Sequence, residues 1–383
     1  MCTVGLRPVG NRLQTGGAKP DFRGTAGGPS LAPGLRTDTG MDIRSLTPPD
    51  KSWDRFVEQH PDATVAHLGA WGRIIEAAYG HESFYLAAED DGELSGVLPL
   101  VLIQSRLFGR RLVSMPFLDY GGILAERGSA AERALADAAL DLARRRGVAS
   151  VGLRQFHPIG LPPTPGHDRV TMRLALADEE TVWRALPAER RNRIRKAERS
   201  GLRAVWAGPE ALDEFYRVFA VNMRDLGSPV HSRRFFQAML TWLPEVARTL
   251  IIRDRTGRAV GAAVCLFFRD TIMVPWVSSL REAFSLCPNF ALYWEVIRTG
   301  CREGYRTLDL GRSFRHAGTF EFKRQWGGRP HALPWIFLDV VPGAPAPVDR
   351  DAGRYRRLVE AWKRLPVPVA NALGPWIRRQ VPN

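Results

Sequence analysis

Apolar and polar residues follow one another along the chain in two similar series, and each series predicts the same order of elements. The first, over residues 83–155, includes SFYLAAEDDGELSGVLPLVLI, GRRLVSMPFLDYGGIL, SAAERALADAALDLARRRG and VASVGLRQ. The second, over residues 247–313, includes ARTLIIRDRTGRAVGAAVCLFF, DTIMVPWVSSL, NFALYWEVIRTGCREG and YRTLDLGRS. Each predicts strand, Asp/Gly turn, strand, strand, helix and strand, and Gly147 or Gly304 ends the helix. The patterns therefore predict two α/β modules of one kind.

The rest of the chain differs in pattern and sets the expected boundaries. Residues 1–40 are rich in Gly, Pro and Thr and have neither an apolar period nor the apolar core of a signal peptide, so we expect them to be disordered. Asp50, after a Pro pair, reads as the cap of an amphipathic helix. The predicted parts are a disordered extension at 1–40, a first module at 41–175, a second module at 176–329, a strand returning to the first module at 330–345 and a basic amphipathic tail at 346–383.

Charge and cysteine content narrow the classes of partner. The net charge of +14 favours an anionic partner such as a nucleotide-diphosphate substrate, a tRNA or an acidic membrane surface, without choosing among them. Four cysteines without short paired spacing argue against a zinc site or a disulfide framework, and no metal is expected. No apolar run reaches the roughly 18 residues of a spanning helix. We therefore expect a cytoplasmic protein, peripheral at the inner membrane at most.

Four blocks carry a resemblance to a known family. They are ERRNRIRKAERSGL (189–202), NMRDLGSPVHSRRFF (222–236), LYWEVI (292–297) and LDLGRSFRHAGTFEFKRQWGG (308–328). Together they resemble the FemAB-like branch of the GNAT acyltransferase superfamily, and within it the FemAB-related subgroup associated with PEP-CTERM/exosortase and exopolysaccharide loci. The resemblance covers about 41–345. It implies an α/β (α+β) fold of tandem GNAT-like modules with a cleft between them.

One lysine stands inside the densest of these blocks. The chain holds 49 Arg and only 5 Lys, so Lys323 indicates that a compact ammonium is wanted there rather than a guanidinium. The resemblance implies that this Lys faces the reacting ester or thioester, where it could stabilise the oxyanion that forms as an amine attacks. The alternative is that Lys323 only pairs with Asp309.

A carboxylate is the second catalytic candidate. Asp119 follows a strand and precedes two glycines, a sequence that is also common in ordinary turns. The stretch is similar to the Fem GPxxDY segment, whose Asp lies at the acceptor site, although Met115 stands here where that pattern begins with Gly. An amine nucleophile must lose a proton, so a positioned carboxylate could act as its base. Asp119 and Lys323 are the predicted catalytic residues.

Several polar residues in the same blocks are predicted to bind substrate. The helix with arginines at 191, 195 and 199 is either a solvated surface or a platform for phosphates, to which Asn192 and Lys196 add donors. Arg224 matches a family Arg that contacts a nucleotide-diphosphate acceptor, whereas His231 reads as an ordinary loop histidine. The predicted substrate-binding residues are Tyr120, Asn192, Arg195, Lys196, Arg224, Tyr293, Asp309, Arg312, Ser313 and Phe322.

The implied function is acyl or aminoacyl transfer to an amine of a cell-envelope or exopolysaccharide precursor. The alternative is a catalytically inactive binding or scaffold protein derived from the GNAT fold. The Arg/Gln-x-x-Gly-x-Gly/Ala loop that holds the coenzyme A pyrophosphate is missing from both modules. No cofactor is therefore expected; the donor is aminoacyl-tRNA or an acyl thioester as a co-substrate, and the acceptor is anionic and nucleotide- or lipid-linked.

The C-terminal tail supports two interpretations. Leu358, Trp362, Leu365, Val369 and Leu373 recur near helical spacing among six basic residues. This pattern is typical of a helix that packs back on the first module. It also fits a peripheral membrane contact, in which Trp and Arg/Lys side chains lie at the headgroup level of an anionic leaflet.

Overall fold

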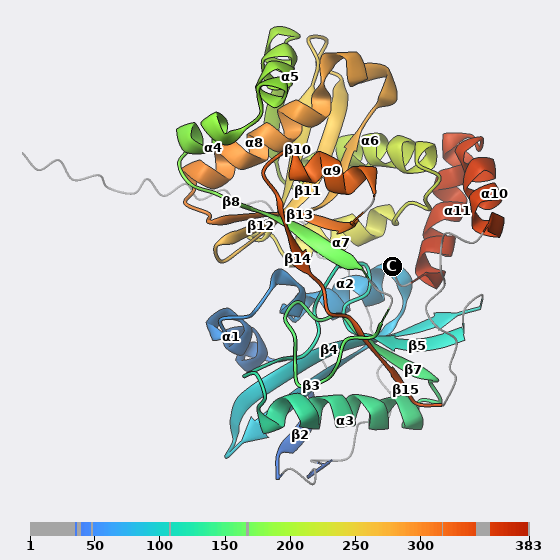
Figure 1. Ribbon diagram of the computed structural model, residues 1–383. Helices are drawn as coiled ribbons and strands as arrows, with labels where there is room; N and C mark the ends of the chain where they lie inside the picture. The colour runs from blue at the N-terminus through green and yellow to red at the C-terminus, as the bar shows by residue number, and fades with distance from the viewer. Residues whose placement is uncertain are drawn as a thin grey trace, which may run out of the picture. The chain divides into compact units, whose positions relative to one another are not determined.

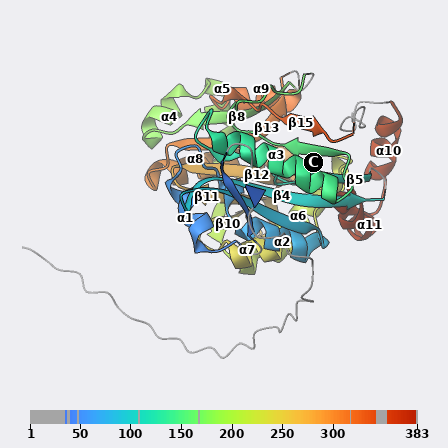
Figure 2. The same ribbon diagram turned by 90° about the horizontal axis from the view of Figure 1, so that it is seen from below.

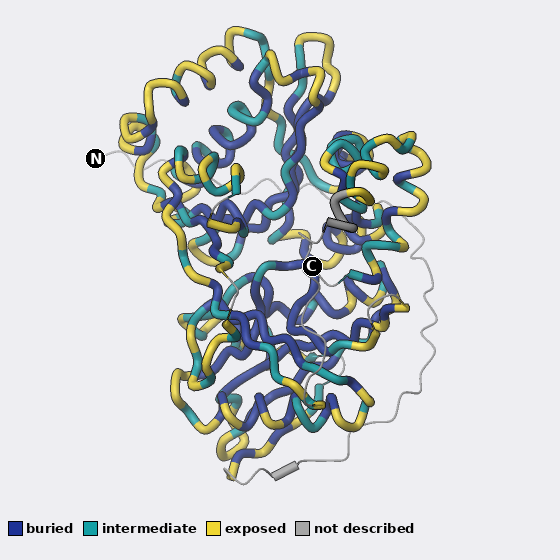
Figure 3. Tube along the Cα trace, turned by 45° about the vertical axis from the view of Figure 1, so that its right-hand side comes forward, coloured by how far each residue is buried: buried dark blue, intermediate teal, exposed yellow. Residues whose placement is uncertain are grey.

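The computed structural model describes residues 35–36, 40–46, 49–106, 109–165, 168–315, 317–341 and 353–381, which all lie in one unit (Figure 1). The expected disorder of residues 1–40 falls almost wholly outside these residues and stays a prediction. Two sheets organise the chain, as the two apolar series predict. Strands are mainly buried, and exposed residues gather on helices and loops (Figure 3).

The first sheet has the strand order β1-β2-β3-β4-β5-β7-β15, and β6 pairs with β4. The β5–β7 pair is parallel, and the other neighbours are antiparallel. Helix α3 packs across one face, as Figure 2 shows from below, and α1 and α2 pack on the other. The elements are β1 (Leu35–Arg36), β2 (Asp42–Leu46), α1 (Lys51–Gln59), α2 (Ala70–Tyr79), β3 (Glu82–Asp90), β4 (Glu93–Ser105), β5 (Gly109–Val113), β6 (Leu124–Ala125), α3 (Ala130–Arg145), β7 (Ser150–Leu153) and β15 (Ile336–Asp339).

Strand β4 shows why its apolar run forms a strand. Val97, Val101 and Ile103 point into the core shared with the second module, whereas the alternate residues Leu98 and Leu100 pack under α3. Successive side chains of a strand point to opposite faces, so an unbroken apolar run suits a strand that is covered on both sides. Both faces of β4 are therefore apolar, and each is covered by a separate core cluster.

The second sheet has the order β14-β8-β13-β12-β11-β10-β9. Helices α6 and α8 pack on its central strands, α5 packs on α8, and α7 contacts α2 of the first module. The elements are β8 (Arg169–Ala175), α4 (Glu179–Ala185), α5 (Ala188–Arg199), β9 (Arg203–Ala207), α6 (Leu212–Asp225), α7 (Arg233–Trp242), β10 (Ala247–Arg253), β11 (Ala259–Phe268), β12 (Thr271–Ser279), α8 (Pro288–Arg302), β13 (Thr307–Phe314), α9 (Gly318–Arg324) and β14 (Arg329–Ala332). Short 3-10 helices lie at Val65–His67 in the first module and at Pro209–Ala211 and Arg281–Leu286 in the second.

Each sheet contains a strand from the opposite part of the chain, and this exchange differs from the predicted boundaries. Strand β8, which we expect at the end of the first module (41–175), lies between β13 and β14 in the second sheet. The predicted returning segment (330–345) holds β14 of the second sheet and β15, which pairs with β7 of the first. Figure 1 shows β14 and β15 as one path between the sheets. Local patterns do not encode pairing between such distant segments.

The C-terminal tail forms two helices, α10 (Gly353–Lys363) and α11 (Val367–Gln380), while 342–352 lie outside the described residues. Helix α11 contacts α6 of the second module and β4 of the first. Arg224 donates to the Leu365 carbonyl at 2.9 Å, and the Gln380 amide oxygen accepts from the Arg106 backbone at 2.7 Å. The tail therefore packs on both modules, not on the first alone. In the part of the chain that the structure describes, no helix is long and apolar enough to cross a bilayer.

Candidate active site

A cavity of about 320 Å³ lies where the two modules and α11 meet. The first module contributes the loop after β5, the second contributes α6, β12, α8, β13 and α9, and the tail contributes one arginine. The wall is formed by Phe117, Leu118, Asp119, Phe219, Asn222, Met223, Leu226, His231, Val274, Pro275, Trp276, Val277, Tyr293, Leu310, Gly311, Arg312, Lys323 and Arg378.

The cavity arises from the way two parallel strands separate. Strands β12 and β13 pair only where Thr271–Met273 lies beside Thr307–Asp309. The residues that follow in each strand, 274–277 and 310–312, line the cavity. On its other side, β13 pairs with β8 with a register shift between Asp309 and Arg312. Separated strands leave backbone and side chains directed at the space between them, so the site is built into the sheet.

The loop that carries Asp119 has a strained backbone. Met115 and Phe117 have φ values of 41° and 72°, which cost non-glycine residues about 1–2 kcal/mol each. The buried Arg154 guanidinium holds the loop by donating to the Leu118 carbonyl at 2.6 Å and the Met115 carbonyl at 3.3 Å. Glycine, which the Fem pattern has at this position, takes a positive φ without this cost. Surrounding contacts, rather than glycine, enforce the turn here.

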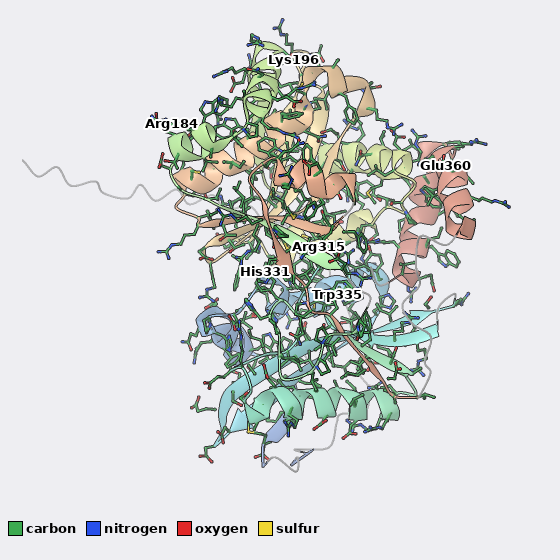
Figure 4. All side chains as sticks on the ribbon, viewed as in Figure 1. Arg184, Lys196, Arg315, His331, Trp335 and Glu360 are labelled. Carbon is green, nitrogen blue, oxygen red and sulfur yellow. The ribbon has the colours of Figure 1, made fainter. Side chains whose placement is uncertain are left out.

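Trp335 supports the same loop from the segment between the two sheets (Figure 4). Its indole N–H donates to the Asp119 carbonyl at 3.1 Å. The guanidinium carbons of Arg154, Arg169 and Arg312 lie 4.6, 4.6 and 5.2 Å from its ring centre. These cation–π contacts help positive charge to gather beside Asp119.

Asp309 is buried behind the cavity wall and shapes the turn that forms it. One oxygen accepts from the Thr171 hydroxyl and, at 2.7 Å, from the Gly311 N–H. The other accepts from the Tyr120 hydroxyl at 2.9 Å. Burial raises the pKa of this carboxyl, although the three donors oppose the change. Gly311 has a φ of 80°, a conformation that suits glycine. Asp309 and Tyr120 are not among the lining residues, so they hold the cavity wall in place from behind and do not contact its space.

Lys323 lies on the short helix α9. Its ammonium donates to the carbonyls of Gly311 at 3.0 Å and Arg312 at 2.8 Å, not to Asp309. Burial lowers its pKa to about 8, against the opposing effect of the Asp119 and Asp309 charges. An ammonium has three donors, and two carbonyls use two of them. The third can serve a bound substrate.

Asp119 and Lys323 come from different modules and meet at Gly311. A methyl group placed on Gly311 would lie 3.7 Å from an Asp119 carboxylate oxygen and 3.8 Å from the Lys323 nitrogen. Asp119 accepts from the Arg312 N–H at 3.0 Å and forms an ion pair with its guanidinium at 3.4 Å. The wall therefore presents a carboxylate and an ammonium on the two sides of one glycine.

The other predicted substrate residues divide into two groups. Tyr293 lines the cavity with Asp119, Arg312 and Lys323, and Phe322 packs against Tyr293 at a ring separation of 5.5 Å. Ser313 is buried beside these residues on β13. The remaining residues lie away from the cavity lining: Arg224 binds Asp225 and the tail, and Asn192, Arg195 and Lys196 lie on α5. Figure 4 shows Lys196 at the end of the second module far from Trp335.

Two titratable residues of the cavity wall, His231 and Arg378, are absent from the sequence-based prediction. His231 is buried, and burial together with the Arg378 charge holds its pKa well below the ordinary value. Arg378 of α11 donates from Nε to His231 Nε2 at 3.0 Å. The sequence contains no signal for His231 beyond an isolated loop histidine. Arg378 stands in a basic stretch, which suggested a membrane contact instead.

Within the described ranges, no group of three or more His, Cys, Asp or Glu side chains is placed to hold a metal ion. The charged groups that line the cavity are Asp119, Arg312, Lys323 and Arg378. With one carboxylate against three cations, the cavity is suited to an anionic ligand.

Comparison with known proteins supports this view of the fold. Residues 188–324 match the family described as Acetyltransferase (GNAT) domain. The crystal structure of FemX has a TM-score of 0.64 at 14% identity, covering 84% of this chain and 100% of that chain. A tandem GNAT protein from the clavulanic acid biosynthesis pathway has a TM-score of 0.51 at 15% identity, covering 79% and 99%. L-PGS from Bacillus licheniformis has a TM-score of 0.50 at 15% identity, covering 88% and 98%.

These matches confirm part of the sequence-based prediction. The chain has the α/β fold of tandem GNAT-like modules. The match of residues 188–324 to the GNAT acetyltransferase domain places the protein in the acyltransferase class of enzymes. The three structural likenesses are likenesses of fold, because their identities are low. No curated protein matches the sequence. The PEP-CTERM/exosortase subgroup stays a prediction.

Proposed function

We propose that this acyltransferase moves an acyl or aminoacyl group onto an amine of a cell-envelope or exopolysaccharide precursor. The observation that supports it most is the meeting of Asp119 and Lys323 at Gly311, on the wall of a cavity between the modules. Amide formation needs a group that accepts a proton from the amine and a donor that stabilises the carbonyl oxygen. The carboxylate and the ammonium supply these two functions.

The proposed reaction proceeds in two steps. The acceptor ammonium binds Asp119, whose carboxylate takes one proton, and the freed amine attacks the acyl carbonyl carbon. The new C–N bond forms while the carbonyl oxygen becomes negative and accepts a hydrogen bond from Lys323. Collapse of this intermediate breaks the C–O or C–S bond of the donor, and the departing alkoxide or thiolate takes the proton held by Asp119. The regenerated carboxylate then accepts the second proton from the new amide nitrogen and passes it to solvent. Lys323 contributes through an interaction that strengthens in the transition state.

The alternative, an inactive scaffold, is less well supported. Loss of catalysis would be expected to leave a cleft filled by apolar side chains. The cavity is instead open enough for a ligand and contains Asp119, Arg312, Lys323 and Arg378. Half-buried charged side chains gathered in one cavity are typical of a site that binds and acts on a charged ligand, so their presence favours an enzyme.

The donor is aminoacyl-tRNA or an acyl thioester that does not bind through the usual phosphate loop. At the N-terminus of α8, where that loop would lie, Cys287 has φ 65° and Pro288 is the first helical residue. Proline has no N–H to offer a pyrophosphate. The basic charge of the chain fits an anionic donor and an anionic nucleotide- or lipid-linked acceptor.

A peripheral contact of the tail with the inner membrane is part of the same proposal. Helix α11 exposes Val369, Leu373 and Trp376 at 40, 46 and 50%, at spacings of four and three residues that place them on one face. The exposed Arg364 and Arg379 add charge that an anionic leaflet would attract by about 1 kcal/mol each. This contact would bring a cytoplasmic enzyme to lipid-linked acceptors.

Co-sedimentation with vesicles tests the contact. Wild-type protein is expected to bind phosphatidylglycerol vesicles more strongly than phosphatidylcholine vesicles, and Trp376→Ser should reduce that binding. Trp242→Ser on α7 is the matched control, because Trp242 is similarly exposed at 41%. Equal reduction by both variants would argue against a membrane face on α11.

A transfer assay tests the enzymatic proposal itself. Purified protein is offered charged tRNA, acyl-carrier protein or acyl-coenzyme A together with amine-bearing nucleotide-linked and lipid-linked envelope precursors, and amide products are detected by mass spectrometry. Asp119→Asn and Lys323→Ala should both abolish most of the product formed by wild type. Product formation that is unaffected by either substitution would remove this cavity from the reaction.

A further inference from the structure

The C-terminal helix contributes directly to the cavity through Arg378. Three contacts seat α11 against the body of the protein on both sides of this residue. A Cβ on Gly374 would lie 2.9 Å from the Val230 backbone nitrogen, so α11 packs against the backbone before α7 at a distance that only glycine allows. His81 donates from Nε2 to the Arg379 carbonyl at 3.0 Å, and Gln380 binds the Arg106 N–H. Arg378 is therefore held in place by a docked helix.

A buried histidine orients the Arg378 side chain. An arginine N–H can only donate, so His231 Nε2 accepts at 3.0 Å and carries no proton. His231 is neutral, because burial and the nearby Arg378 charge lower its pKa. The proton therefore lies on Nδ1, which donates to the Tyr79 oxygen at 2.7 Å. Ser232 N–H also donates to this oxygen at 3.3 Å.

This relay spans three parts of the chain. Tyr79 ends α2 of the first module, His231 precedes α7 of the second, and Arg378 belongs to the tail. The Phe117 ring of the strained loop lies 5.8 Å from the Arg378 guanidinium carbon. Such an arrangement fixes a guanidinium at the cavity wall, where it joins Arg312 and Lys323.

We propose that Arg378 is a binding residue for a diphosphate group in the cavity, so that the C-terminal helix completes the substrate site. A guanidinium has a planar set of donors that fits phosphate oxygens, and the cavity has an excess of positive charge. His231 and Tyr79 are positioning residues that act through Arg378. The inference rests on the proposed function, because it places the anionic part of the acceptor beside the reacting groups.

Isothermal titration of the full-length protein with three diphosphates tests this inference. The probes are inorganic pyrophosphate, uridine diphosphate and geranyl diphosphate. Wild type should bind at least one, and Arg378→Gln should weaken that binding by about 10- to 100-fold, the effect of losing hydrogen bonds to a charged group. Arg357→Gln is the matched control, since it removes the same charge from an exposed residue of the same tail, and it should bind as wild type.

The probes also distinguish the source of the group. Tighter binding of uridine diphosphate would indicate that the diphosphate belongs to a nucleotide-linked acceptor, and tighter binding of geranyl diphosphate would indicate a lipid-linked acceptor. Equal binding of all three probes would indicate that the site recognises the diphosphate alone. If Arg378→Gln does not fold, Arg378→Lys decides, because it keeps the charge and loses the planar donor set. A several-fold loss supports the inference, and unchanged affinity overturns it.

Failure of this inference is separable from failure of the proposed function. Absence of binding by wild type to all three probes, or equal binding by Arg378→Gln, overturns the diphosphate site. If Arg378→Gln transfers the acyl group with an unchanged KM for the acceptor, the diphosphate site is also overturned, but the proposed transferase function is retained. Binding that depends on Arg378, in a protein that transfers no acyl group, supports the site and overturns the reaction.

Discussion

Replacing Lys323 by Met should remove a dependence of stability on pH that wild-type protein shows above pH 8. Burial lowers the pKa of Lys323 from the ordinary 10.5 to about 8 in the folded protein. Below pH 8 the side chain is protonated in both folded and unfolded states. Between pH 8 and 10.5 the folded state loses the proton while the unfolded state keeps it. The unfolded state then binds more protons, so the free energy of unfolding rises with pH.

The magnitude follows from the two pKa values. Their difference, at 1.36 kcal/mol for each pKa unit, corresponds to about 3 kcal/mol. At pH 7 wild-type protein bears this cost of burying the ammonium, and Lys323→Met, with similar length and no charge, does not. The stability advantage of the variant should therefore be largest near pH 7 and shrink by about 3 kcal/mol as the pH approaches 10.5.

Urea unfolding followed by tryptophan fluorescence measures this difference at half-unit steps from pH 7 to 10.5. Other groups titrate in that range, and comparison of the two proteins cancels their contributions. Lys196→Met is the matched control, because Lys196 is exposed on α5, and its difference from wild type should stay constant. A difference between Lys323→Met and wild type that is also constant over this range would refute the reasoning.

Chemical labelling provides an independent measurement. The chain has only 5 lysines, so trace acetylation followed by peptide mass spectrometry resolves each of them. Only the neutral amine reacts, so the rate for Lys323 should rise to half its plateau near pH 8. Substrate is not needed, and the result bears on the electrostatics of the site whether or not the reaction is identified.

Three further outcomes are expected. Lys323→Ala should lower kcat by about 10²–10³-fold with little change in KM, as expected for loss of an oxyanion donor, and Lys323→Arg should restore little; steady-state kinetics measures both. Tyr120→Phe should lower the free energy of unfolding by about 1–3 kcal/mol, because the buried Asp309 oxygen loses its donor, and equal stability in urea unfolding would contradict this. Gly311→Ala should cost about 1–2 kcal/mol through its φ of 80°, and it should also reduce turnover by placing a methyl group between Asp119 and Lys323, which thermal unfolding and kinetics would detect.

The local elements could be predicted because their causes are local. Alternation in the run that becomes β4 and helical spacing in α3 and α8 depend on neighbours within a few residues, and glycines at positive φ follow both helices. Asp50 caps α1 as expected by accepting from the Ser52 N–H. Asp119 and Lys323 could be proposed because each stands in a short stretch with a family resemblance.

Other parts of the site depend on contacts between distant segments. The residues of β8 alternate as those of any strand do, so nothing in them determines that β8 pairs with β13 rather than in the first sheet. Lys323 likewise lies on the short helix α9, along which Glu321 and Arg324 form an ion pair. Helical pairs of this kind stabilise a short helix only slightly, so packing decides its formation.

The sequence by itself determined the two modules, the order of their elements and the two residue types that meet at Gly311. Only the tertiary structure decided which strands the sheets exchange and that Arg378, 147 positions from His231, reaches the same cavity as Asp119. The physical reason is the sequence separation over which each interaction acts. Backbone preference and apolar period act over a few residues, whereas a cavity is formed by surfaces whose approach depends on burial of the whole core.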